Sequence, residues 1–136
     1  MSESKEHANL VKVAVNYART VVPEGMKELV QYDSLETKRP PMIAGNYIPD
    51  VYFWNRNLLI IGEAKTFDDF ERKHSQAQFV AYLQECKSFY GEAMLIVAIP
   101  WQLVAGAKNY FRRLKLKMNF TTPIIILNEL GRRYSI

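Results

Sequence analysis

Three short runs of consecutive apolar residues place the strictest limit on how this chain can fold. They span residues 58–61, 93–99 and 123–127. Such runs are typical of strands buried on both faces, because a strand covered by helices has no polar side. Residues 69–89 and 102–117 lie after the first and second runs and predict two helices, the first of roughly five turns. Strands and helices in alternation predict a mixed sheet with helices on both faces.

The N-terminal part adds a helix and a long loop to this plan. Residues 6–19 are rich in apolar side chains and contain no glycine or proline, which predicts an amphipathic helix. Residues 27–30 predict either a further short turn or the start of a strand. Residues 33–49 hold the densest turn-forming sequence of the chain, and therefore predict a loop.

A hairpin follows the loop. β-Branched and aromatic residues are enriched at 50–54 and 58–65, and Asn55-Arg56-Asn57 separates the two stretches. We therefore expect one domain over residues 1–136 of the α/β (α+β) class. Its elements should follow the order αβββαβ, with a further helix and strand at the C-terminus.

The supply of metal-binding side chains narrows the chemistry. The 136 residues include one cysteine, Cys86, and two histidines, His7 and His74. One thiol cannot form an internal disulfide or a multi-thiolate zinc site, so any metal should be a hard cation held by oxygen atoms. No apolar run approaches the roughly 18 residues of a membrane span, and the first residues lack the pattern of a secretory signal. We expect a cytoplasmic protein that does not contact a membrane.

Charge is distributed unevenly along the chain. The net charge is +4, but residues 1–99 carry 11 basic and 13 acidic side chains, whereas residues 100–136 carry 7 basic and 1 acidic. A basic C-terminal third is compatible with binding to a polyanion. It is equally compatible with an ordinary solvated helix face.

The predicted hairpin brings charged residues together. If its turn is centred between Arg56 and Asn57, then Asp50 lies opposite Glu63, and Lys65 shares their face of the sheet. Charged groups are costly in such apolar strands unless they are paired or bind a metal. A divalent ion between the two carboxylates would remove their repulsion. The alternative is a structural cluster in which Lys65 bridges both acids.

The same residues resemble a known nuclease signature. Ile48-Pro49-Asp50-Val51 and Glu63-Ala64-Lys65, with twelve residues between Asp50 and Glu63, resemble the PD-(D/E)xK motif of restriction-endonuclease-like nucleases. The helix that carries His74-Ser75 and Gln78-Phe79-Val80-Ala81-Tyr82-Leu83 resembles the helix that follows this motif in several such families. The resemblance implies a restriction-endonuclease-like core and a Mg²⁺-dependent endonuclease acting on DNA.

It also assigns roles to individual residues. Asp50 and Glu63 would hold Mg²⁺, or Mn²⁺ as a substitute, with the Ala64 carbonyl as a third ligand. Lys65 would assist the attacking water, and Gln78 would contribute to the site, although an ordinary polar residue at the edge of the helix's apolar stripe is the alternative. Members of the family often add an acid from the first helix. The candidates here are Glu3, Glu6, Glu24 and Glu28, or Asp33 in the loop.

The basic third has a use under this interpretation. Five side chains predicted on one helix would contact DNA phosphates: Lys108, Arg112, Arg113, Lys115 and Lys117. Partners would be DNA and either a second copy of the chain or a larger nucleic-acid-processing complex. His74 has a side chain suited to proton transfer near neutral pH, but we expect it at the helix surface or in a supporting position behind the site. Cys86 is expected in the core.

Two other functions compete with the nuclease. One is a nuclease-fold module that binds nucleic acid or protein without turnover. The other, a two-carboxylate glycosidase, is disfavoured because Lys65 beside Glu63 favours ionised acids over the protonated acid which that reaction needs.

Overall fold

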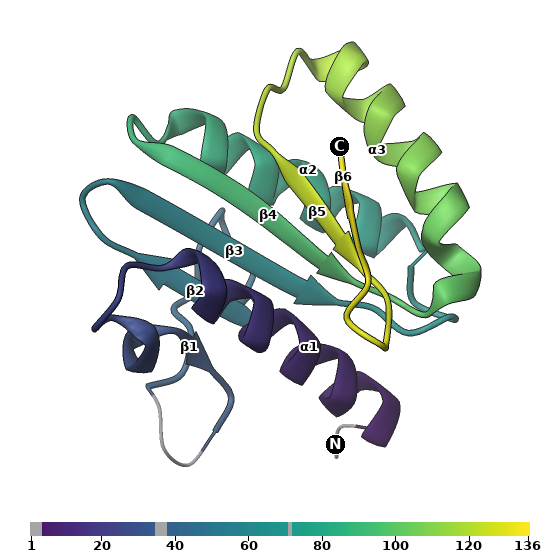
Figure 1. Ribbon diagram of the computed structural model, residues 1–136. Coiled ribbons are helices and arrows are strands. Elements are labelled where there is room, and N and C mark those ends of the chain that lie inside the picture. The colour runs from purple at the N-terminus through teal and green to yellow at the C-terminus, as the bar shows by residue number, and fades with distance from the viewer. Residues whose placement is uncertain (1–3, 35–37, 71) are drawn as a thin grey trace.

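The computed structural model describes residues 4–34, 38–70 and 72–136, and in this part of the chain three α-helices cover a six-stranded sheet (Figure 1). The helices are α1 (Lys5–Val21), α2 (Lys73–Ser88) and α3 (Val104–Met118), with 3-10 turns η1 (Lys27–Leu29) and η2 (Trp101–Leu103). The strands are β1 (Gln31–Tyr32), β2 (Val51–Trp54), β3 (Leu58–Ala64), β4 (Glu92–Ala98), β5 (Ile124–Leu127) and β6 (Arg133–Ser135). The predicted α/β class and element order are confirmed.

Strand order in the sheet follows the order along the chain. β1, β2 and β3 pair antiparallel, β3, β4 and β5 pair parallel, and β6 pairs antiparallel with β5. Each parallel step needs a crossover connection, and α2 and α3 supply the two crossovers. The C-terminal ends of the parallel strands β3 and β4 therefore lie side by side, and α1 begins near them (Figure 1).

Helices cover both faces of the sheet, as the buried strands require (Figure 1). Side chains alternate along β3: Ile60 packs on the α1 side, whereas Leu59 and Ile61 pack on the side of α2 and α3. On the α1 side the stripe of Leu10, Val11, Ala14, Val15 and Ala18 is buried. This stripe is the amphipathic face that the sequence predicts, and the helix is capped by Ser4, whose Oγ accepts a hydrogen bond of 3.1 Å from the His7 amide.

The second helix begins later than predicted. We expected it to start at Asp69, but α2 starts at Lys73. Thr66 Oγ1 donates a hydrogen bond of 3.0 Å to Asp69 Oδ2, and Ser75 Oγ donates one of 2.6 Å to the Asp69 carbonyl. Phe70 turns into the core, with its ring centre 5.7 Å from that of Phe79. These contacts hold the segment after β3 as a turn instead of a helical continuation.

The chain ends in a strand that the sequence analysis did not predict. β6 contains only three residues, of which two are exposed, so no apolar pattern in the sequence identifies it as a strand. The turn before it depends on Asn128, whose Oδ1 accepts hydrogen bonds from the amides of Leu130 and Arg132, and on Gly131 at φ +81°. That positive φ is a conformation glycine adopts without strain.

Candidate active site

The hairpin of β2 and β3 brings Asp50 and Glu63 together. Val51 pairs with Gly62, which is the predicted register. Asp50 directly precedes Val51 and Glu63 directly follows Gly62, so the two carboxyls meet near the start of β2 and the end of β3. Asp50 Oδ2 accepts a hydrogen bond of 2.8 Å from the Ala64 amide, which ties the loop acid to β3.

Gly62 allows this close pairing. A Cβ atom at position 62 would lie 2.8 Å from Cβ of Val51, which is closer than two unbonded carbons approach. Only glycine fits here without moving β2 away from β3. The glycine next to Glu63 is therefore explained by packing.

Glu63 is buried in a ring of polar groups. Its side chain is 6% exposed, Lys65 Nζ lies 3.3 Å from Oε2, and the Tyr82 hydroxyl donates a hydrogen bond of 3.1 Å to Oε1. Burial raises the pKa of Glu63 to about 8; the negative charge of Asp50 adds to the rise, and Lys65 opposes it. Without a further cation, this carboxyl holds its proton up to neutral pH.

Gln78 joins the site through Tyr82. The Gln78 amide Nε2 donates a hydrogen bond of 3.0 Å to the Tyr82 hydroxyl, which in turn donates to Glu63. Burial is the main cause of the raised pKa of Tyr82, so the phenol stays protonated and acts as a donor. Gln78 is 6% exposed, and its oxygen Oε1 accepts no hydrogen bond from the described residues. We call Asp50, Glu63, Lys65, Gln78 and Tyr82 the Glu63 centre.

Tyr82 is a site residue to which the sequence analysis gave no role. It stands in the run that resembles the helix after the nuclease motif, four residues after Gln78. That i, i+4 spacing is the signal that could have identified it.

His7 supplies the contact from α1 that the resemblance leads one to expect from an acid. His7 Nε2 lies 3.3 Å from Asp50 Oδ2. Of the acids considered for this role, Glu3 lies outside the described residues, Glu6 is exposed, and Glu24 Oε2 lies 3.8 Å from Lys27 Nζ. Glu28 follows α1, in the 3-10 turn η1. His7 precedes the buried stripe of α1 by one turn, which is the sequence signal that points to it.

Asp33, the remaining acid considered, lies in the neighbourhood of Asp50. Two small hollows of about 160 and 210 Å³ are each lined by both aspartates. Lys12 of α1 borders the first hollow, and Arg39 borders the second, with its Nε 3.2 Å from Asp33 Oδ1. Asp50 is therefore open to solvent on two sides, between α1 and the loop that precedes β2.

His74 and Cys86 lie where the sequence predicts them. His74 is exposed on α2, with its ring centre 5.7 Å from that of Tyr47. Cys86 is buried, and burial raises the pKa of its thiol to about 12, so it remains protonated. It behaves as a small apolar residue.

Two of the five basic residues predicted to contact DNA face the C-terminal strand. Lys108 Nζ lies 4.6 Å from the centre of the Tyr134 ring, and Lys115 Nζ donates a hydrogen bond of 3.0 Å to the Ile136 oxygen. Burial lowers the pKa of Lys115. Both side chains already have contacts within the fold.

The other three basic residues are exposed on α3. Arg113 and Lys117 line the side of α3 that faces α2. Arg112 is one turn from Lys108 and thus nearer the opposite flank. The five residues do not form a single continuous row, and their contact with DNA remains a prediction.

The donor set at the Glu63 centre suits a hard cation. Across the residues that the structure describes, no three His, Cys, Asp or Glu side chains form a group that could hold a metal. The centre offers two carboxylates and the unsatisfied buried oxygen of Gln78. The Ala64 carbonyl lies on the same edge of β3 as its N–H, which faces Asp50. Oxygen atoms of these kinds are ligands that Mg²⁺ accepts, together with water and substrate phosphate.

These observations define a class of protein: an α/β protein with a mixed sheet and a buried carboxylate–lysine cluster at the C-terminal ends of its parallel strands. Comparison of the chain with protein-family models, with curated proteins and with solved structures found no match. Among the described helices, none is long and apolar enough to cross a membrane. The assignment of function therefore depends on the chemistry of the site.

Proposed function

We propose that this chain is a Mg²⁺-dependent endonuclease that hydrolyses phosphodiester bonds of DNA. The observation that carries the proposal is the convergence of Asp50, Glu63 and Lys65 at the C-terminal end of β3, with Lys65 Nζ 3.3 Å from Glu63 Oε2. Two acids and an amine are what a phosphodiester hydrolase needs to hold a cation and to stabilise negative charge on phosphate. The resemblance to the PD-(D/E)xK signature supports the same assignment.

The residues that surround the proposed metal site have defined roles under this proposal. Asp50, Glu63 and the Ala64 carbonyl hold the cation. Lys65 orients the attacking water and offsets charge on the phosphate. Tyr82 fixes the Glu63 carboxyl through its hydrogen bond, and His7 Nε2, 3.3 Å from Asp50 Oδ2, supports Asp50 from α1.

When bound, Mg²⁺ supplies Lewis acidity, which lowers the pKa of a bound water and neutralises charge on the phosphate. Burial, together with the charge of Asp50, raises the pKa of Glu63, and a bound cation would offset both effects and favour the ionised carboxylate.

A cleavage assay tests the proposal. The purified protein is incubated with plasmid, linear, single-stranded and branched DNA, with Mg²⁺, with Mn²⁺ or with EDTA. Metal-dependent cutting is expected, and Asp50→Ala and Lys65→Ala should abolish it. Glu92→Gln is the matched control, because it removes an exposed carboxylate at the start of β4, the opposite end of the sheet from Glu63. The proposal fails if no substrate is cut, or if the two centre variants cut as well as the control.

The second candidate is a module that binds without turnover. Lys65 already pairs with Glu63, and the two carboxylates are not joined by a third acidic or histidine ligand in a metal-holding group among the described residues. Such a cluster is also stable as a purely structural ion-pair network. Salt-sensitive DNA binding with no heat of Mg²⁺ binding in calorimetry would favour this module over the nuclease.

A further inference from the structure

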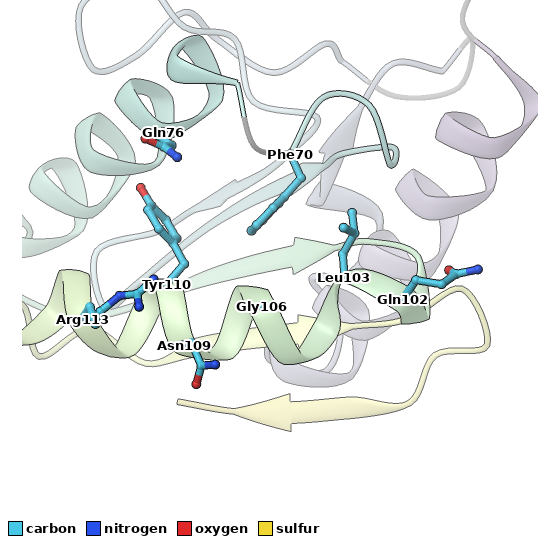
Figure 2. A pocket seen from close by; sticks show the side chains of 8 residues that line it. All are labelled: Phe70, Gln76, Gln102, Leu103, Gly106, Asn109, Tyr110 and Arg113. Atoms are coloured by element: carbon cyan, nitrogen blue, oxygen red, sulfur yellow. The ribbon is translucent and has the colours of Figure 1, made fainter.

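A groove separate from the Glu63 centre lies between α2 and α3. It consists of two adjoining hollows of about 470 and 590 Å³, whose shared wall is formed by Gln76, Tyr110 and Arg113. Figure 2 shows the first hollow, with Tyr110 reaching from α3 toward Gln76 and Phe70 approaching α3 from the loop after β3. We call the two hollows the α2–α3 groove.

The charged side chains of the groove are all cationic. Lys73 enters it from α2, and Arg113 and Lys117 enter it from α3. Of the lining residues that the structure describes, none is acidic. Exposed cations in a groove whose described lining residues include no acid are electrostatically complementary to phosphates.

The uncharged lining suits a nucleobase. Three amide side chains and one phenol border the first hollow: Gln76, Gln102, Asn109 and Tyr110. Amide groups read the hydrogen-bonding edges of bases, and aromatic rings accept a base by stacking. A base is free to enter such a hollow only when it is unpaired, because pairing occupies one edge of the base.

Gly106 lies at an open part of the first hollow. It lies on α3, one turn before Tyr110, and a Cβ atom added there would meet nothing within 4 Å. The position therefore does not require glycine for packing, and its φ is not positive. Glycine weakens a helix, so its presence at an exposed helical position is unexplained by stability. Here it leaves space on the surface that lines the groove (Figure 2).

The groove and the Glu63 centre lie on opposite flanks of α2. Gln78 and Tyr82 face Glu63, whereas Lys73, Gln76 and Val80 face α3. One helix thus presents carboxylate-binding groups on one side and a cationic surface on the other. A ligand in the groove does not occupy the position of the reacting phosphate.

We propose that the α2–α3 groove binds single-stranded nucleic acid, with phosphates on Lys73, Arg113 and Lys117 and an unpaired base over Gly106. The inference goes beyond hydrolysis, because the groove holds a strand whether or not the Glu63 centre cuts it. It also selects Arg113 and Lys117 from the five basic residues of the sequence prediction, and leaves out Arg112.

Binding in EDTA tests the proposal apart from cleavage. Fluorescence anisotropy follows a labelled 20-nucleotide single strand, and the matching duplex, over a series of salt concentrations. The double variant Arg113→Ala/Lys117→Ala should weaken single-strand binding at least tenfold and reduce the salt slope by about 1.4, or about 0.7 for each lost phosphate contact. Arg112→Ala is the matched control, since it removes an exposed arginine next to Arg113, and it should change affinity less than twofold.

A second pair of variants tests the base pocket. Gly106→Gln fills the space with a good helix former, so it should fold normally by circular dichroism yet weaken single-strand binding more than duplex binding. Ala105→Gln places the same side chain at a neighbouring exposed position outside the lining and should leave binding unchanged.

Several results would overturn the inference. The first is a loss of single-strand affinity in Arg112→Ala as large as that in the double variant. The second is that the double variant loses as much affinity for a poly-glutamate competitor as for the single strand. The others are a preference for the duplex and no binding at all. None of them bears on the Asp50 and Lys65 cleavage test, so failure of the groove and failure of the nuclease proposal are distinguishable.

Discussion

The two flanks of α2 show opposite ways of holding charge. At the Glu63 centre, the Glu63 carboxyl is held by a lysine and a tyrosine, and its burial raises its pKa to about 8 although the lysine opposes the rise. In the α2–α3 groove, the cations are exposed at the ends of long side chains. Burial fixes a group in position but disfavours its charge, whereas exposure keeps the charge and leaves the group mobile. Bond-breaking chemistry needs the first arrangement, and holding a long anion needs only the second.

Removing the Asp50 carboxylate should separate the two regions most strongly. Asp50→Asn is expected to lower kcat on DNA by about 10³-fold, because it deletes a charged ligand of the cation. Arg113→Ala should instead raise KM several-fold and leave kcat within about twofold. Steady-state kinetics with Mg²⁺ measures both, and an equal loss of kcat in the two variants would mean that the regions are not functionally distinct.

Between pH 5 and pH 9 the buried Glu63 should make the free energy of unfolding depend on pH. The folded pKa of Glu63, about 8, lies above its ordinary value of 4.5, so the folded state retains a proton that the unfolded state releases. The stabilisation is complete below about pH 4.5 and is lost as pH rises toward 8, by up to about 1.4 kcal/mol per pH unit.

Urea unfolding in EDTA from pH 5 to pH 9 measures this loss. Glu63→Gln should abolish this part of the pH slope, and Mg²⁺ should reduce it in the unsubstituted protein. Arg113→Ala should leave it unchanged. A slope that survives in Glu63→Gln would assign it to other groups.

Removing the Tyr82 hydroxyl should have an intermediate effect. Tyr82→Phe keeps the ring in the core but leaves Gln78 Nε2 and Glu63 Oε1 without their shared partner. Loss of such a supporting contact should lower metal affinity or kcat by about 10- to 100-fold. Calorimetric titration with Mg²⁺ and kinetics measure the two quantities, and Tyr90→Phe, at an exposed tyrosine just before β4, is the control. Unchanged metal affinity and kcat in Tyr82→Phe would show that the hydroxyl does not position Glu63.

The smallest effect is expected at Gly106. Gly106→Ala should raise the free energy of unfolding by about 0.8–1.0 kcal/mol, because alanine is the better helix former and meets no neighbour. Thermal unfolding measures the change. A loss of stability would mean that the glycine is needed by the fold, and would remove one argument for an open groove.

Patterns that depend on local periodicity were predictable from the sequence. The apolar runs gave the central strands, and the turn at 55–57 gave a hairpin register that places Asp50 against Glu63. These features follow from side-chain alternation and turn length, which act over a few residues. The resemblance to a nuclease signature rests on the same local spacing.

Contacts between distant segments were less predictable. His7 and Tyr82 reach the site from helices separated from the hairpin by loops, and no short-range pattern fixes which way those helices slide. The start of α2 was placed four residues early because the bonds of Thr66 and Ser75 to Asp69 compete with helix formation. β6 forms only because β5 offers an edge to pair with.

Two structural requirements, close packing and a charged cluster, alternate along the end of β3 and the residue after it. The four positions are Gly62, Glu63, Ala64 and Lys65. Gly62 and Ala64 lie toward the α1 side, where the first has no room for a side chain and the second is 1% exposed. Glu63 and Lys65 lie toward the opposite face, where Tyr82 of α2 contacts Glu63. A mutational screen for protein abundance should therefore reject substitutions at 62 and 64, whereas a screen for DNA cleavage should additionally reject them at 63 and 65. Odd and even positions of four consecutive residues would then be under different kinds of selection.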